Sequence, residues 1–213
     1  PLVPTIYAFL VELVERGSYD VSSLRLCISG GASLPEALLH KVESILGVTV
    51  LEGYGLTETS PVISVNKLAD GSVPGSVGPV LSNLEINIVE ESGQPVPKGQ
   101  VGEIWVRGPT VTRGYWNRAE ETKKAFTNDN WFKTGDLGHI DTNNRLYISA
   151  GRKKDLIIRA GENISPLAIE NTLMNHPGVL EVAAVGVPHP RSGEQVKVCV
   201  VLKEDVTVTE VEL

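Results

Sequence analysis

A strand, turn, helix and second strand near the amino terminus restrict the fold of this chain more than any other feature. Leu24 to Ile28 is an apolar run typical of a strand, and residues 29–31 contain two glycines that can turn the chain. Ser33 and Glu36 have the spacing of a capping box, which predicts the start of a helix. Gly47 can end this helix, and Val48 to Leu51 is the next apolar run. Because a helix joins the two strands, this unit predicts parallel strands and an α/β fold.

Ligands of open parallel sheets gather at the carboxyl ends of the strands, and special residues follow both strands here. We expect a bend at Gly30-Gly31, after the first strand, and a second bend at Gly53-Tyr54-Gly55, after the second strand. Glycines allow close backbone approach, and a tyrosine offers a flat face to a base. Thr57 offers a hydroxyl to phosphate, and Glu58 a carboxylate to Mg²⁺. A tight turn with a buried tyrosine and a capping threonine is the alternative interpretation of the same bend.

The middle of the chain has the pattern of a β-rich region. Leu84 to Val89 and Val101 to Val106 alternate like two antiparallel strands. Ala119 to Phe126 is a short polar helix, and Trp131 to Asp136 is interpreted as an aromatic-rich loop. Gly138 to Ser149 has the pattern of a hairpin. The expected fold is therefore α/β, with a parallel βαβ portion followed by a β-rich subdomain.

A polar, mostly basic stretch from Gly151 to Asp155 is the best candidate for a domain boundary. We expect residues 1–150 to be the C-terminal part of a large domain and residues 151–213 to be an incomplete, small α+β domain. In the second part, Ser165 and Pro166 are well placed to begin a helix. The expected strands there are Leu156 to Arg159, Leu180 to Val187 and Val196 to Leu202.

Net charge, the length of apolar runs and the spacing of histidines argue against nucleic acid, a membrane span and a bound zinc ion. The chain has 19 basic and 26 acidic side chains and a net charge of −7, which argues against nucleic acid as a partner. No apolar run reaches the roughly 20 residues that a membrane span needs. No two of the four histidines have the spacing of zinc ligands, so a protein-bound zinc is not expected.

Four motifs occur in the following order: Gly30 to Ser33, Tyr54 to Glu58, Trp131 to Gly138 and Gly151 to Asp155. The sequence resembles the adenylate-forming enzymes, nearest to the long- and medium-chain fatty acid–CoA ligases, over nearly its whole length. Such enzymes join a fatty acid to ATP as an acyl-adenylate and then transfer the acyl group to coenzyme A. The resemblance implies ATP, Mg²⁺ and coenzyme A as cofactors.

The same resemblance implies roles for individual residues. Thr57 contacts phosphate and Glu58 holds Mg²⁺, so these two are the implied catalytic residues. Tyr54 stacks on adenine, and Asp136 accepts hydrogen bonds from the ribose hydroxyls. The implied nucleotide-binding residues are Gly31, Ala32, Ser33, Glu52, Gly53, Tyr54, Gly55, Leu56, Thr57, Asp136 and Arg152.

The acyl chain and coenzyme A have implied contacts of their own. In relatives specific for acetate, a bulky tryptophan at the position of Gly55 closes the acyl pocket. The glycine of this chain is therefore implied to leave the pocket open for a longer acyl chain. Lys154 is the implied hinge between the two half-reactions. Ala160 and Gly161 face the pantetheine arm of coenzyme A.

Several departures from the family pattern limit what this chain is expected to do alone. The phosphate-binding loop of the family belongs before Pro1, and its adenylation lysine belongs after Leu213. We therefore expect a fragment that lacks measurable ligase activity alone. Ala150 is interpreted as an insertion, and Ala168 stands where relatives usually carry an acid.

Other readings stay open for the same motifs. An adenylation domain that loads a carrier protein, an aryl-acid–CoA ligase and a non-catalytic nucleotide-binding relative each contain such a site. The resemblance implies a cytoplasmic location, and it admits peripheral contact with membranes because fatty acids partition into bilayers. The sequence predicts no oligomeric state.

Overall fold

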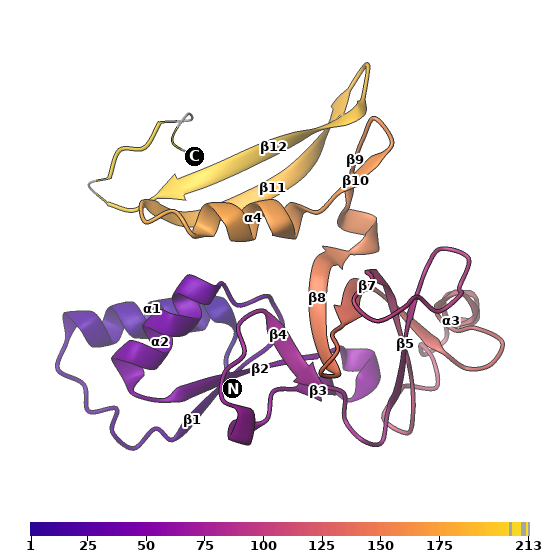
Figure 1. The fold of residues 1–213 in the computed structure, drawn as a ribbon, viewed down its shortest axis with the longest axis horizontal. Helices are drawn as coiled ribbons and strands as arrows, with labels where there is room; N and C mark the ends of the chain where they lie inside the picture. Colours follow the sequence, from indigo (N-terminus) through magenta and orange to yellow (C-terminus); the bar gives the residue numbers. More distant parts are fainter. Residues whose placement is uncertain (205, 210–211, 213) are drawn as a thin grey trace. The chain divides into compact units, whose positions relative to one another are not determined.

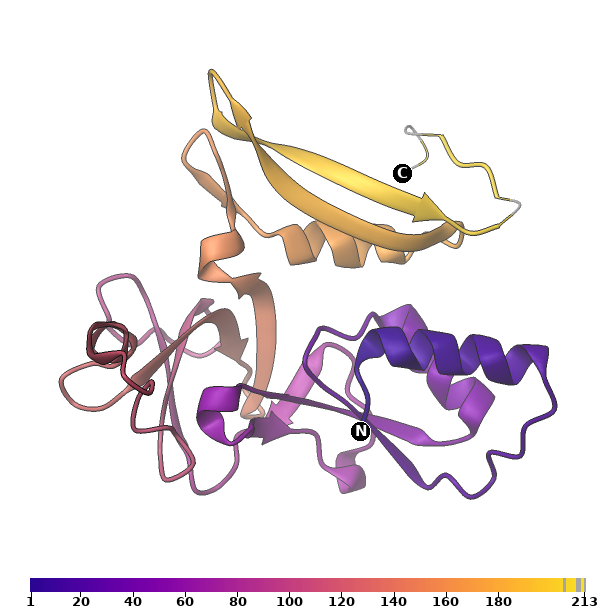
Figure 2. The same ribbon diagram turned by 180° about the vertical axis from the view of Figure 1, so that it is seen from behind.

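The structure is a computed structural model that describes residues 1–204, 206–209 and 212. The chain forms two compact units, Pro1–Ile148 and Ser149–Leu213, which are described separately. Figures 1 and 2 show their elements from opposite sides. Within the described residues, no helix is both long enough and apolar enough to cross a membrane.

The βαβ unit predicted from the sequence is present in the first unit. Strand β1 (Leu26–Ser29) pairs in parallel with β2 (Thr49–Gly55), and helix α2 (Glu36–Leu46) connects them. Helix α1 (Pro4–Arg16) packs beside α2 (Figure 1). These elements share an apolar core whose buried members are Tyr7, Val11, Cys27, Leu34, Leu39, Val42, Leu46, Val48 and Val50.

The predicted capping box at the start of α2 is wrong. The residue preceding the helix is Pro35, and no side-chain hydrogen bond caps this end. Leu34 is buried in the apolar core, so burial of this side chain holds the loop where a cap was expected. The other end follows expectation: Gly47 has φ +66°, and its N–H donates to the carbonyl of Glu43.

Strand β2 continues through the segment that was predicted to bend. Gly53 and Tyr54 pair with β3 (Val62–Val65) as an antiparallel strand. The chain turns later, in the 3₁₀ helix η1 (Thr57–Thr59). The hydroxyl of the fully buried Thr59 accepts from the N–H of Leu56 at 3.0 Å, which closes this turn. The prediction of a bend at residues 53–55 is therefore wrong, since the glycines belong to a strand.

A five-stranded antiparallel sheet forms the β-rich part of the first unit. The prediction of a loop from Trp131 to Asp136 is wrong, because most of it lies in the long strand β7. Alternate side chains of β7 are buried from Phe132 to Gly138, which is the pattern of a strand with one face in a core. The strand order is β4 (Ser76–Pro79), β8 (Arg145–Arg152), β7 (Phe132–Ile140), β6 (Gly102–Arg107) and β5 (Glu85–Val89).

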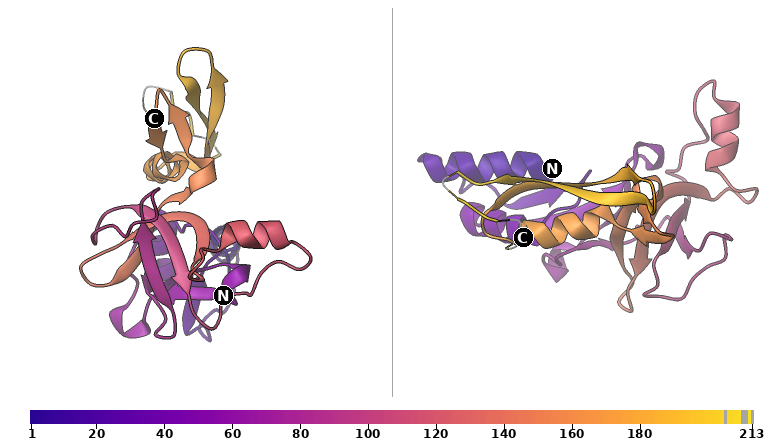
Figure 3. Two further views of the ribbon diagram at one scale, coloured as in Figure 1. Left: turned by 90° about the vertical axis from the view of Figure 1, so that its right-hand side faces the viewer. Right: turned by 90° about the horizontal axis from the view of Figure 1, so that it is seen from above.

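Two further helical segments accompany these first-unit sheets. The short helix α3 (Ala119–Ala125) precedes β7 and projects from the sheet (Figure 3). The 3₁₀ helix η2 (Leu68–Asp70) lies between β3 and β4. The helix expected between residues 119 and 126 is thus present, and it ends one residue early.

The second unit has a four-stranded sheet covered by one helix. Its strand order is β10 (Glu162–Ile164), β9 (Ile157–Arg159), β12 (Gly193–Leu202) and β11 (Val179–His189), and β10 was not predicted. Helix α4 (Pro166–Met174) packs on β11. It begins as expected, because Ser165 Oγ accepts from the N–H of Ala168 at 3.1 Å.

Candidate functional site

One face of the β1–β2–β3 sheet carries a group of buried polar side chains. Ser29 pairs with Glu52 across β1 and β2, and Tyr54 pairs with Ser64 across β2 and β3. Paired residues point to the same face, and so do alternate residues of one strand. Ser29 and Ser64 are at most 1% exposed, and Glu52 is 6% exposed. Among the described residues, Ser29 Oγ, Ser64 Oγ and Glu52 Oε1 find no hydrogen-bond partner.

Burial controls the charge of Glu52. Desolvation raises the pKa of Glu52 to about 7. Hydrogen bonds from the backbone N–H groups of Leu34 and Gly75 oppose this by favouring the ionised form. The carboxyl therefore joins the end of the loop after β1 to the segment before β4, and it changes charge near neutral pH.

The loop after β1 lies directly beside β2. A Cβ added to Gly30 would stand 3.3 Å from the carbonyl oxygen of Gly53, so the two glycine segments are close neighbours. Gly31 has φ +83°, a conformation that favours glycine. Gly31, Ala32 and Ser33 are all exposed to solvent. The loop is thus an open rim next to the polar face.

Tyr54 and Asp136 meet although 82 positions separate them in the sequence. The Tyr54 hydroxyl donates to Asp136 Oδ2 at 2.6 Å, and Asp136 is 6% exposed. The N–H of Asp136 donates to Thr134 Oγ1 at 3.1 Å, and that hydroxyl donates to the carbonyl of Ile104 at 2.7 Å. The structure therefore joins two motifs that the sequence could only place in order.

Glu58 has partners that the sequence did not identify. The Tyr115 hydroxyl donates to Glu58 Oε1 at 2.7 Å, and the N–H of Thr112 donates to the Glu58 carbonyl at 2.7 Å. The segment 108–116 thereby closes on η1. Gly114-Tyr115-Trp116, an aromatic pair after a glycine in a loop, was the only available signal in the sequence.

Comparison with known proteins identifies the family. Residues 1–116, more than half of the chain, match the model of the AMP-binding enzyme family. The chain belongs to the AMP-binding enzyme family. Residues 168–213 match the AMP-binding enzyme C-terminal domain. The resemblance on which the sequence interpretation was based is therefore confirmed.

Curated relatives of this AMP-binding enzyme chain are ligases named for different acids. It is 43% identical over 205 residues to a long-chain-fatty-acid–CoA ligase of Bacillus subtilis, covering 96% of the chain and 36% of the relative. It is 42% identical over 204 residues to a sulfoacetate–CoA ligase of Cupriavidus necator, covering 95% of the chain and 39% of the relative. The chain thus spans little more than a third of the length of these relatives.

Solved structures share the fold. ATP-bound MatB from Rhodopseudomonas palustris is 39% identical with a TM-score of 0.91, over 99% of this chain and 42% of MatB. A benzoate CoA ligase from Burkholderia xenovorans LB400 is 30% identical with a TM-score of 0.85, over 98% of this chain and 41% of the ligase. The mixed α/β fold of the AMP-binding enzyme family is therefore shown over almost the whole chain.

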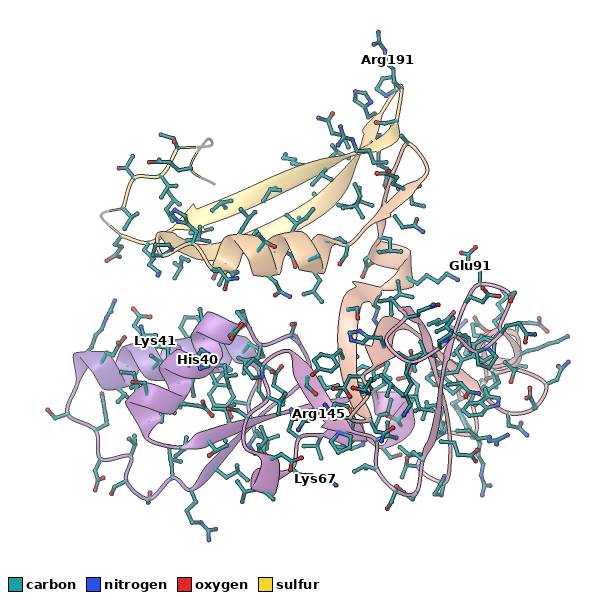
Figure 4. The ribbon with its side chains drawn as sticks, viewed as in Figure 1. His40, Lys41, Lys67, Glu91, Arg145 and Arg191 are labelled. Atoms are coloured by element: carbon teal, nitrogen blue, oxygen red, sulfur yellow. The ribbon has the colours of Figure 1, made fainter. Side chains whose placement is uncertain are left out.

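The residues of this AMP-binding enzyme chain fit Mg²⁺ in one specific way. Among the described residues, no three His, Cys, Asp or Glu side chains are grouped so that they could hold a metal. For example, Nε2 of the exposed His40 on α2, which Figure 4 labels, lies 3.4 Å from Oε1 of Glu36, and these two side chains alone do not make a metal-binding group. Mg²⁺ commonly binds one or two carboxylates together with substrate phosphates. The single carboxylate of Glu58 is compatible with this mode, and its role as a Mg²⁺ ligand stays a prediction.

Gly55 has a local reason to be glycine. A Cβ at this position would stand 1.7 Å from the carbonyl oxygen of Pro61 and 2.9 Å from Cα of Val62. In this chain, the close approach of β2 to the start of β3 therefore leaves no room for a Cβ at position 55. The acyl-pocket role of Gly55 stays a prediction from the resemblance.

Four of the predicted site residues belong to the second unit. Arg152 ends β8, and Lys154 lies in the 3₁₀ helix η3 (Lys153–Asp155). Ala160 and Gly161, with φ of 51° and 86°, form the turn between β9 and β10. Their roles stay predictions, as does the insertion at Ala150, whose side chain lies outside the described part of the structure.

Replacing Tyr115 by phenylalanine is expected to loosen the 108–116 segment. The variant keeps the ring and loses the hydrogen bond to Glu58. Amide hydrogen exchange of Thr112 should become faster, by about tenfold if the bond contributes about 1.4 kcal/mol to closure. Exchange at the buried Val106 of β6 serves as the internal control. Unchanged exchange of Thr112 would show that the hydroxyl does not hold the segment.

Proposed function

We propose that this chain carries the nucleotide-binding part of an acid–CoA ligase whose acid is a fatty acid. The observation that carries the proposal is the contact of Tyr54 with Asp136 beside the loop of residues 30–33. A flat ring, an acceptor-only carboxylate and an open glycine loop form a site suited to a base, a ribose and a phosphate. Membership of the AMP-binding enzyme family supports the same ligand.

In the proposed reaction, a carboxylate oxygen of the acid attacks the α-phosphorus of ATP, and pyrophosphate leaves. The thiol of coenzyme A then attacks the acyl carbon, and AMP leaves. Asp136 accepts hydrogen bonds from the ribose hydroxyls, and the Tyr54 ring supports the base. Thr57, whose side chain is exposed at η1, donates to a phosphate oxygen. Mg²⁺, when bound beside Glu58, supplies positive charge that offsets the phosphate charge.

A fatty acid is proposed over other acids on the strength of the relatives. Ligases named for long-chain fatty acids occur in several bacteria at 36 to 43% identity to this chain. The sulfoacetate ligase at 42% identity makes a small polar acid the second candidate.

For the rest of the chain we propose the division implied by the sequence. Residues 1–150 are assigned to the large AMP-binding domain and residues 151–213 to the small C-terminal domain. Arg152 is assigned to the nucleotide and Lys154 to the hinge. Ala160 and Gly161 are assigned to the coenzyme A arm. The supporting observation is the family match of residues 168–213 to the C-terminal domain.

Calorimetry with non-hydrolysable acyl-adenylate mimics tests the proposal. Three mimics carry octanoyl, sulfoacetyl and benzoyl groups on the same adenosine. We expect the octanoyl mimic to bind the chain most tightly, and Asp136→Ala to weaken all three by at least about tenfold, the value of one lost charge-assisted hydrogen bond. Tighter binding of the sulfoacetyl or benzoyl mimic would overturn the fatty acid assignment. Absence of binding by all three would overturn the nucleotide site itself.

A further inference from the structure

The Tyr54 hydroxyl is held in a fixed position by the ring that carries it. The ring packs against two apolar clusters, one around the buried Ile63 and Phe132 and the other around Val77 and Ile104. A ring that contacts two cores has little freedom to turn away. The direction of the hydroxyl toward Asp136 is therefore set by packing, and the 2.6 Å hydrogen bond follows from it.

The Asp136 carboxylate is fixed from its backbone side as well. The pairing of β6 with β7 shifts register between Glu103 and Trp105, and Gly135 has φ +74° in the facing part of β7. Such irregularities re-aim a side chain. The Thr134 hydroxyl accepts from the Asp136 N–H and donates to the Ile104 carbonyl. These two hydrogen bonds hold the backbone of Asp136, and with it the direction of the side chain.

We propose that the Tyr54 hydroxyl is a positioning group that orients the Asp136 carboxylate for the two hydroxyls of a ribose. The inference rests on the proposed nucleotide site and gives Tyr54 a second task besides stacking on the base. A carboxylate has about four acceptor positions, so it can accept from Tyr54 and from a diol together. A carboxylate that is already oriented loses less entropy when the ribose binds.

Replacing Tyr54 by phenylalanine separates the two tasks. The ring remains available for stacking, and only the hydroxyl is lost. The probes are the octanoyl-adenylate mimic and its 2′-deoxy counterpart, measured by calorimetry. We expect wild type to prefer the ribose form by about tenfold or more, and Tyr54→Phe to reduce this preference to about two- to threefold. A purely stacking role predicts the same preference in both proteins.

Two further variants keep the test decisive. Thr134→Val removes the second hydroxyl that orients Asp136, and it is expected to reduce the ribose preference in the same direction. Tyr19→Phe, at a tyrosine that is 56% exposed and remote in sequence, is the matched control and should leave the preference unchanged. If Tyr54→Phe loses its native circular dichroism, the result with Thr134→Val decides.

The possible outcomes distinguish this inference from the function on which it rests. Binding of both probes with an unchanged ribose preference in Tyr54→Phe and Thr134→Val would overturn the positioning role and leave the nucleotide site intact. Absence of binding of either probe to wild type would overturn the nucleotide site, and the positioning role with it. A reduced preference in both variants, with the control unchanged, supports the inference.

Discussion

The Glu52→Gln variant is expected to be more stable than wild type at pH 8 and equally stable near pH 4.5. Burial raises the pKa of Glu52 from 4.5 to about 7 in the folded chain. Between these values the unfolded chain releases the proton while the folded chain keeps it. The free energy of unfolding of wild type therefore falls as pH rises through this window. Each pKa unit corresponds to about 1.36 kcal/mol, so the full loss is about 3 kcal/mol.

Glutamine keeps the shape of a protonated carboxyl and has no charge to release, so the variant lacks this loss. Urea unfolding at a series of pH values, followed by tryptophan fluorescence, measures the difference. All three tryptophans, at positions 105, 116 and 131, belong to the first unit and report on it. Glu120→Gln, at an exposed carboxyl of α3, is the control and should follow wild type. A constant difference between Glu52→Gln and wild type from pH 4.5 to 8 would contradict the raised pKa of a buried Glu52 carboxyl.

The Gly55→Ala variant is expected to lose about 3 kcal/mol of stability or more, at the upper end of the cost of overpacking. The added Cβ would stand 1.7 Å from the carbonyl oxygen of Pro61, a backbone atom that cannot rotate away. The start of β3 must therefore move. The same fluorescence measurement at pH 7 gives the change.

Gly30→Ala is the matched control for this substitution. Its nearest neighbour would be a single backbone oxygen at 3.3 Å, so it should cost clearly less than Gly55→Ala. Similar losses for the two variants would show that β2 and β3 do not approach as described. A large loss for Gly55→Ala alone would give this glycine a structural role that is independent of the acyl chain.

Local patterns predicted the fold best where one side chain or one conformation decides the structure. Gly47 ends α2 because its left-handed conformation suits glycine, and Ser165 begins α4 because its hydroxyl caps a free N–H. Ser33 and Glu36 have the spacing of a capping box, yet no side-chain hydrogen bond caps the start of α2. Burial of Leu34 competes with the cap there, and the sequence does not show which residue of a loop will enter a core.

Pairing between distant strands could not be predicted from local patterns. Gly53-Tyr54-Gly55 has turn-like composition, yet it forms a strand because β3 comes back against it. The segment from Trp131 to Asp136 is likewise a strand because β6 and β8 flank it. The contact of Tyr115 with Glu58 depends on the same kind of long-range approach, so Tyr115 was not recognised as a neighbour of the site.

Three separate segments of this chain are proposed to form one nucleotide site. Amide chemical shifts of the isotope-labelled chain, recorded during titration with AMP, test it most directly. We expect saturable shifts that cluster in residues 30–34, 52–58 and 134–136. Saturable shifts confined to other parts of the chain, or no shifts at millimolar AMP, would contradict it.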